Sequence, residues 1–272
     1  MSIACWKRAV RLHVRHETTY AYDRPIAGSA QIVRLFPQSH AGLEILSWKV
    51  TAAGKTLTPS RDGLGNLYAL AVSRRPASQM IVLVQGEVAT REGNGALEGI
   101  HDPLPPVYFL RTTPLSEADA PLAALGASIA QTNDPARALM ARVHEMIEFR
   151  PGATTTGVTA AEAFARGAGV CQDHAHIALA AARAADIPAR YVSGYLHTGK
   201  SAEPASHAWV EIRQGDAWLG IDPANGVVVG EKYVRVAAGL DYEDVAPVRG
   251  VRLGGAQERL SVLVDVLTGA EQ

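Results

Sequence analysis

A cysteine, a histidine and an aspartate in the second half of the chain have the residue types of a nucleophilic triad. Cys171 lies in the segment GVCQDHAH, at residues 169–176, directly before an alanine-rich apolar stretch that predicts a helix. The first turn of a helix presents unpaired N–H groups and the positive end of the helix dipole, and both stabilise a thiolate. A cysteine in this place can therefore become a nucleophile.

His207 and Asp222 lie in two segments that read as the strands of one hairpin. If Gln214 and Gly215 form the centre of its turn, His207 pairs directly with Asp222. Directly opposed residues have Cβ atoms about 4.5–5.5 Å apart, so the carboxylate can accept a hydrogen bond from the imidazole. The same register gathers an apolar set on the other face of the hairpin: Ala208, Val210, Ile212, Ala217, Leu219 and Ile221. A shift by one residue would mix the two faces, which burial disfavours.

Together these three residues predict acyl transfer through a thioester. Asp222 would hold His207 in one tautomer and stabilise the imidazolium that forms when His207 takes the proton of Cys171. The thiolate would then attack an acyl carbon, and water or an amine would resolve the thioester. The backbone N–H of Cys171 is the expected oxyanion donor, and Gln172 is a candidate for the second donor.

Composition narrows the partners and the compartment. The 272 residues are 47% hydrophobic with a formal net charge of -1 and no lysine- or arginine-rich block, so we expect neither a nucleic acid nor a membrane as partner. The two cysteines, Cys5 and Cys171, are too few for a disulfide framework and favour a reducing compartment. No apolar stretch approaches the roughly 18 residues that span a bilayer, and no export signal is visible, so we expect a cytoplasmic protein.

The hydrophobic pattern divides the chain into two predicted domains, residues 1–100 and residues 101–272. From about residue 10 to residue 92 the period is two, with turn-forming clusters between the segments. This pattern predicts an antiparallel β-sandwich, to which we assign a scaffolding or substrate-shaping role. A loop rich in glycine and proline follows at residues 93–106.

The second predicted domain has helices first and strands after. Helices are predicted from the cap Asp134, from the capping-box residue Thr159, and over residues 170–185. Strands follow at residues 189–195, 206–212, 217–221, 232–236 and 260–266. This order predicts an α+β fold in which the cysteine helix packs on an antiparallel sheet.

Longer motifs surround the three candidate residues. They are GVCQD at 169–173, IPARYVSGY at 187–195, SHAWVE at 206–211, DPANG at 222–226 and DYEDVAPVRG at 241–250. Together they resemble the bacterial transglutaminase-like cysteine peptidase family, over about residues 130–266. The N-terminal domain resembles the β-domain of that family through YAY at 20–22 and DGLGN at 62–66.

The resemblance implies a papain-like α+β core in which Cys171 is the nucleophile, His207 the base and Asp222 the residue that orients the base. It also implies amide chemistry on peptide-like substrates, with no cofactor. His174 departs from the family pattern, which has an aromatic residue, commonly phenylalanine, at this place. Because it lies one helical turn beyond Cys171, His174 is a candidate to line the site or to perturb the thiol.

The favoured function is hydrolysis of a peptide or isopeptide amide, because water is the default acceptor of a thioester. Amine transfer to a glutaminyl substrate, a transglutaminase reaction, is the alternative within the same chemistry. Two other classes stay open. Cys171 and His174, with Asp173, His176 and His207, offer ligands of zinc type, although no second paired motif accompanies them. A non-catalytic binding module on the same fold is the third class, against which the intact triad argues.

Overall fold

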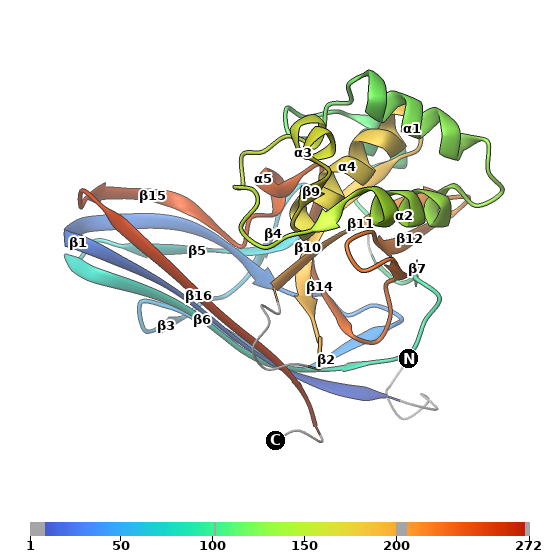
Figure 1. The fold of residues 1–272 in the computed structure, drawn as a ribbon. Helices are drawn as coiled ribbons and strands as arrows, with labels where there is room; N and C mark the ends of the chain where they lie inside the picture. The colour runs from blue at the N-terminus through green and yellow to red at the C-terminus, as the bar shows by residue number, and fades with distance from the viewer. Residues whose placement is uncertain (1–8, 101, 200–205, 270–272) are drawn as a thin grey trace.

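The computed structural model describes residues 9–100, 102–199 and 206–269, and its strands form two large sheets with the helices gathered over the second (Figure 1). The first sheet has eight strands in the order β3-β2-β6-β1-β5-β4, with β15 and β16 also paired to β1. The bounds of these strands are β1 Val10–Phe36, β2 Leu43–Ala52, β3 Lys55–Thr56, β4 Ser60–Arg61, β5 Leu67–Ser73, β6 Ala77–Thr90, β15 Val248–Gly254 and β16 Glu258–Thr268.

Strand β1 organises the first sheet, because it is 27 residues long and has partners on both sides. Its first half pairs with β6 and with β16, and its second half pairs with β5 and with β15. The register shifts between Ile26 and Gly28, where the two halves meet. A Cβ atom at Gly28 would lie 2.8 Å from the carbonyl oxygen of Ser73, so a side chain at residue 28 would force the two strands apart.

The predicted division of this region into two stacked sheets is not confirmed, since the strands of residues 10–90 belong to one hydrogen-bonded sheet. The sheet curls along its length (Figure 1), and residues such as Leu12 and Val84 on its strands are fully buried. The prediction that the strand at residues 260–266 belongs to the second domain was wrong, because β15 and β16 both pair with β1. β1 pairs along both of its edges, so it also binds β15 and β16 from the far end of the chain. The local hydrophobic pattern does not reveal such long-range pairing.

The second sheet has the order β13-β12-β11-β10-β14, with β7 paired to β12. Its strands are β7 Ala96–Leu97, β10 Ala189–Leu196, β11 Ser206–Gln214, β12 Ala217–Asp222, β13 Val227–Val228 and β14 Tyr233–Gly239. All pairs in this sheet are antiparallel, as predicted. A separate parallel pair joins β8, Glu148–Phe149, to β9, Ala168–Gly169.

Helix α4 lies at the centre of the helical cluster and contacts three other helices as well as β10 and β11. The helices are η2 Pro106–Leu110, α1 Ala120–Ala130, α2 Pro135–Met146, α3 Ala160–Arg166, α4 Cys171–Ala184 and α5 Tyr242–Val245. The predicted caps are confirmed, since Asp134 accepts from the N–H of Arg137 and Thr159 forms a capping box with Glu162. None of the helices in the described ranges combines the length and the apolar character of a membrane span.

Small residues let α4 approach its neighbours closely. The face predicted from Ala175, Ala178 and Ala182 is fully buried. On the opposing helix α1, a Cβ atom at Gly126 would lie 2.3 Å from the carbonyl oxygen of Ala181. The backbone of α1 is therefore in direct contact with the last turn of α4.

Hydrogen bonds fix the two sheets to each other. The side-chain amide of Asn66, from the first sheet's DGLGN turn, donates to the carbonyl oxygen of Ala238 and accepts from the N–H of Ala238, both at 2.8 Å. Nearby, Nδ1 of His16 lies 2.9 Å from the hydroxyl of Tyr195 on β10. These contacts are buried, so the two sheets form one body.

Candidate active site

Cys171 is the first residue of α4, as the sequence predicted, and its side chain is half-buried. The helix start is fixed by Asp173, which is 1% exposed. One oxygen of Asp173 accepts a hydrogen bond from the N–H of Val170 at 2.7 Å and another from the hydroxyl of Thr154 at 2.5 Å. The thiol therefore sits on a fixed helix terminus, beside N–H groups that have no partner within the helix.

His207 and Asp222 are in direct contact. Nε2 of His207 lies 2.6 Å from Oδ2 of Asp222, and the two side chains are 9% and 0% exposed. Both residues come from the same face of the hairpin formed by β11 and β12, the face away from the apolar set that packs toward α4. Both side chains thus lie on the face of the hairpin that the alternation of residues predicted.

The predicted register of this hairpin was wrong by two residues. Val210 pairs with Ile221 and Gln214 pairs with Ala217, so the turn is Gly215 and Asp216 instead of Gln214 and Gly215. Gly215 has a φ of 57°, and a glycine with positive φ at the first central position is the signature of a type II′ hairpin turn. A shift of two keeps every side chain on its face, so His207 reaches Asp222 diagonally.

Asp222 accepts hydrogen bonds from residues that the sequence analysis did not single out. Oδ2 accepts from Nδ2 of Asn225 at 2.7 Å and from the hydroxyl of Tyr233 at 2.8 Å. Oδ1 accepts from the backbone N–H groups of Ala224 and Asn225, at 3.0 and 3.2 Å. The DPANG motif could have predicted the two backbone hydrogen bonds, because an aspartate that starts a turn accepts from the N–H groups that follow it.

These contacts set the charges of the pair. Burial by itself lowers the pKa of His207, but hydrogen bonds to Asp222 and to Cys171, together with the negative charges of both, raise the pKa to about 10. Burial likewise acts to raise the pKa of Asp222, and the hydrogen bonds from His207, Asn225 and Tyr233 outweigh it and hold that pKa below its usual range. At neutral pH His207 is therefore an imidazolium that faces the ionised carboxylate of Asp222.

Two aromatic rings surround the imidazole. The ring of Trp209 lies roughly parallel to that of His207, with centroids 6.3 Å apart and an angle of 25°, and the ring of Tyr233 lies 6.2 Å from it. Trp209 and Tyr233 pack edge to face on each other. A cavity of about 500 Å³ adjoins this group, and Asn225 and Tyr233 are part of its lining.

Gln172 and His174 lie in the first turn of α4 with other contacts. The side-chain amide of Gln172 donates to the carbonyl oxygen of Thr156 at 3.0 Å. His174 is fully buried, with Nδ1 2.9 Å from the carbonyl oxygen of Val170 and Nε2 3.1 Å from that of Ile147. His174 thus ties α4 to the end of α2 through Nε2, while Nδ1 faces the start of its own helix. A role of Gln172 or His174 in catalysis remains a prediction.

The zinc alternative depends on Cys171, Asp173, His174, His176 and His207. Within the described ranges, no group of three or more histidine, cysteine, aspartate or glutamate side chains is arranged to hold a metal ion. The nitrogens of His174 face carbonyl oxygens, and Nε2 of His176 faces the N–H of Tyr242. The side chains that the CxxH spacing suggested as zinc ligands therefore contact different groups of the protein.

Comparison with known proteins agrees with this fold. The model of the transglutaminase-like superfamily matches residues 123–223, and that of the bacterial transglutaminase-like N-terminal region matches residues 12–89. The uncharacterized protein ML0607 of Mycobacterium leprae is 31% identical over 280 residues, which cover 94% of this chain and 98% of that one. The uncharacterized protein Rv2569c of Mycobacterium tuberculosis is 29% identical over 290 residues, covering 94% and 92%. The chain belongs to the transglutaminase-like superfamily.

A solved structure shares the whole architecture. The crystal structure of a Cytophaga hutchinsonii protein, described as a "Putative Cysteine Protease", superposes with a TM-score of 0.77 at 18% sequence identity. The match covers 97% of this chain and 92% of that chain. At this identity the likeness concerns the fold, including both sheets and the helical cluster.

Proposed function

We propose that the protein is a thiol-dependent acyl-transfer enzyme that hydrolyses peptide or isopeptide amides through a Cys171-His207-Asp222 triad. The observation that supports this best is the position of His207, whose Nε2 lies 2.6 Å from Oδ2 of Asp222 and whose pKa is raised by Asp222 and Cys171 together. Because Nε2 faces Asp222, the other ring nitrogen, Nδ1, is the one that exchanges a proton with the thiol.

Acylation follows from this arrangement. His207 holds the thiol proton of Cys171, and the thiolate attacks the amide carbon of the substrate. A tetrahedral oxyanion forms, which the backbone N–H of Cys171 at the start of α4 stabilises. His207 then donates its proton to the leaving amine, the C–N bond breaks, and an acyl thioester on Cys171 remains.

Deacylation reverses the proton transfers. Neutral His207 removes a proton from water, the resulting hydroxide attacks the thioester carbon, and the C–S bond breaks. The carboxylic acid leaves, and the proton that His207 has gained restores the initial thiolate and imidazolium pair. Asp222 stays ionised throughout, since its pKa is held below the usual range. An amine that reached the thioester before water would give amine transfer by the same steps.

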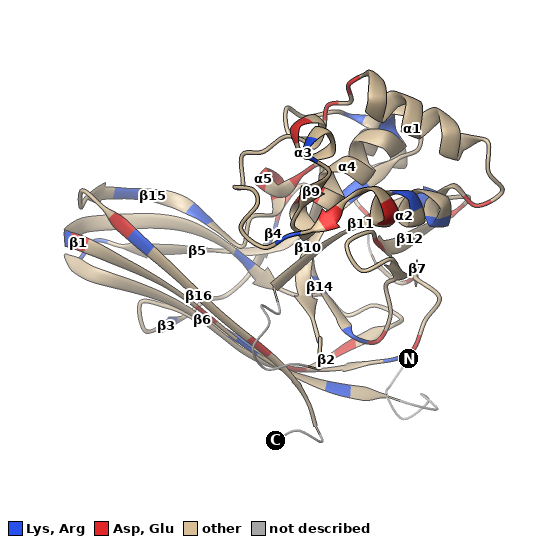
Figure 2. Ribbon diagram, viewed as in Figure 1, with Lys and Arg blue, Asp and Glu red and all other residues tan. Residues whose placement is uncertain are grey.

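We further propose a peptide or protein substrate and a cytoplasmic location. The cavity of about 500 Å³ beside Asn225 and Tyr233 has room for several substrate residues. Charged residues of both signs are interspersed along the elements in Figure 2, which supports the expectation of no nucleic-acid partner. The composition with two cysteines supports a reducing compartment.

The decisive experiment compares the wild-type chain with Cys171→Ala on peptide, isopeptide and γ-glutamyl amide libraries. Each reaction is run with and without an added primary amine, and hydrolysed and amine-linked products are counted by mass spectrometry. We expect hydrolysis to dominate in the wild type and all turnover to be lost in the variant.

Cys5→Ser is the matched control, because it removes the chain's other thiol. We expect it to keep full activity and to leave Cys171 as the residue alkylated fastest at neutral pH. Turnover that survives Cys171→Ala would contradict the assignment of the nucleophile, and amine-linked product in excess would replace hydrolysis with amine transfer.

A further inference from the structure

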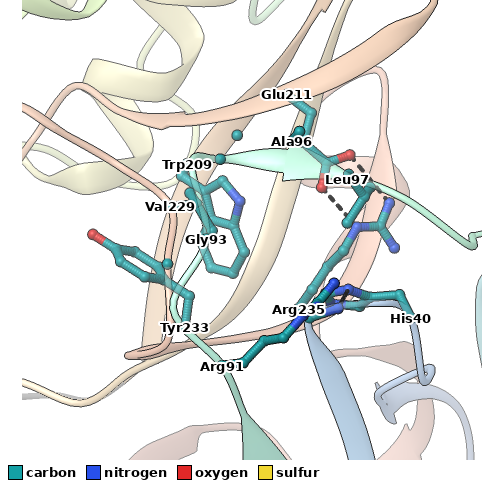
Figure 3. Close-up of a pocket in the computed structure, with 14 residues that line it drawn as sticks. His40, Arg91, Gly93, Ala96, Leu97, Trp209, Glu211, Val229, Tyr233 and Arg235 are labelled. Atoms are coloured by element: carbon teal, nitrogen blue, oxygen red, sulfur yellow. Dashed lines mark hydrogen bonds and ion pairs between the residues drawn. The ribbon is translucent and has the colours of Figure 1, made fainter. Parts of the chain in front are cut away.

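A second pocket lies at the junction of the two sheets, on the face of β11 that also carries His207. Its cavity has a volume of about 60 Å³. Its walls come from three parts of the chain: His40 beside β2, the segment of residues 91–97, and strands β11, β12 and β14 (Figure 3). The pocket shares Trp209 and Tyr233 with the surroundings of His207, but the proposed acyl transfer places no substrate group in it.

Arg235 supplies a fixed cation in this pocket. Its side chain is 7% exposed, and Glu211 binds Nε at 2.7 Å and Nη2 at 3.3 Å (Figure 3). Glu211 is held in turn by Arg190 from the far side. Within the described chain, Nη1 of Arg235 has no partner, so a guanidinium N–H is held in place and left to donate.

His40 supplies a second donor. Its Nδ1 accepts a hydrogen bond from the N–H of Gly42 at 3.1 Å, which requires that the proton of the neutral ring sits on Nε2. Burial, followed by the positive charge of Arg235, lowers the pKa of His40 to about 4, so the ring is neutral at physiological pH. The Nε2–H group has no acceptor in the described part of the chain.

Trp209 supplies a third donor. The side chain is 1% exposed, and Figure 3 shows its indole nitrogen on the side of the ring that faces Glu211 and Arg235. Arg91 and Tyr233 also line the pocket, and the other walls are apolar side chains such as Leu97 and Val229, together with glycines. Arg235, His40 and Trp209 thus each present an N–H donor, while both oxygens of Glu211, the one carboxylate in the described lining, are already engaged by arginines.

We propose that this pocket binds a small oxyanion, a carboxylate or phosphate group, between Arg235, His40 and Trp209. N–H donors without acceptors around one small cavity favour an anion, and charge-assisted bonds to a guanidinium are strong. The cavity volume of about 60 Å³ is about that of two water molecules. It suits a group of four or five heavy atoms and is too small for a larger charged group. The apolar walls accommodate the carbon that carries the group.

The test follows the indole N–H signal of Trp209 by nuclear magnetic resonance. The chain has four tryptophans, so the signal can be assigned with Trp209→Phe. Sodium acetate, inorganic phosphate and neutral acetamide are titrated separately into the full chain at constant ionic strength. We expect a saturable shift with acetate or phosphate and none with acetamide, and the anion that saturates at the lower concentration identifies the group as carboxylate or phosphate.

His40→Leu removes one donor and should weaken anion binding about tenfold. His13→Leu is the matched control, because His13 is half-buried on β1 and does not line the pocket, and binding should be unchanged. Cys171→Ala should bind as the wild type does, so failure of the proposed catalysis would leave this result untouched. The proposal is overturned if neither anion gives a saturable shift, if acetamide gives the same shift, or if His40→Leu binds as tightly as the wild type.

Discussion

Asp222 is fully buried and accepts hydrogen bonds from a histidine, a tyrosine, an asparagine and two backbone N–H groups. A carboxylate with so many donors is fixed in orientation and stays ionised. Its position therefore fixes the ring of His207, and with it the direction in which a proton can leave Cys171. At the scale of residues, the proposed activity depends on this one carboxylate as much as on the nucleophile.

Asp222→Asn should lower kcat by up to about 10⁴-fold with a folded chain, because the amide cannot stabilise the imidazolium and favours the wrong tautomer. Tyr233→Phe, which removes one donor to Asp222, should cost only about tenfold. Asp216→Asn is the control, since Asp216 is fully exposed in the turn of the same hairpin. Steady-state kinetics on an amide substrate measure all three, and equal rates for Asp222→Asn and Asp216→Asn would contradict the role.

The pH dependence follows from the raised pKa of His207. The histidine carries its proton up to a pH of about 10, well above the ordinary value of 6.5. The proton is needed for the leaving amine, so kcat/KM for an amide should hold through neutral pH and fall as the pH rises through about 10. Alkylation of Cys171 by iodoacetamide needs only the thiolate and should not fall there. A decline in kcat/KM near pH 6.5 would show that the ion pair is absent.

At the scale of elements, the last turn of α4 packs on α1 through a glycine. Gly126→Ala would bring a methyl group within 2.3 Å of the carbonyl oxygen of Ala181, so the helices must separate. We expect a loss of about 1–3 kcal/mol in the free energy of unfolding, measured by urea denaturation. Ala127→Ser, on the exposed side of the same helix, should change it by less than about 0.5 kcal/mol. Equal stability of the two variants would show that the contact is not tight.

The hairpin shows what the sequence could and could not predict. Alternation assigned the faces of β11 and β12 correctly, because burial of the apolar face excludes an odd shift. It could not distinguish registers that differ by two residues, since these leave every side chain on the same face. The identity of the turn residues, Gly215 and Asp216, is what distinguishes these registers. The triad residues were found despite the error, because diagonal neighbours on one face can still meet.

Other parts of the site were beyond local sequence reasoning. Tyr233 lies on β14, which is not adjacent to β12 in the sheet, yet its hydroxyl bonds Asp222. A contact between strands that are not neighbours depends on the order of the strands in the sheet. The hydrophobic period of the sequence does not encode this order. The same limit explains why β16 was assigned to the wrong sheet and why β15 was not predicted. The helix caps at Asp134 and Thr159, which are local, were predicted correctly.

At the scale of the whole molecule, β16 contributes to a sheet whose other strands lie near the start of the chain. Val266 on β16 is 7% exposed, and Leu263 on the same strand is 64% exposed. Val266→Asp buries a charge without a partner and should destabilise the protein by about 3 kcal/mol or more, whereas Leu263→Asp should be nearly neutral. Thermal unfolding measures both. If the two variants had equal stability, β16 would not be needed to complete the first sheet.

The two-sided pairing of β1 also bears on how the chain is made. One side of β1 is filled by β5 and β6, which the ribosome produces soon after it, but the other side waits for β15 and β16. During synthesis of the helices and the second sheet, that side of β1 presents unpaired N–H and carbonyl groups to other nascent chains. Translation speed and chaperone supply should therefore govern the yield of this protein in expression, since the risk of aggregation ends only when the last strands emerge.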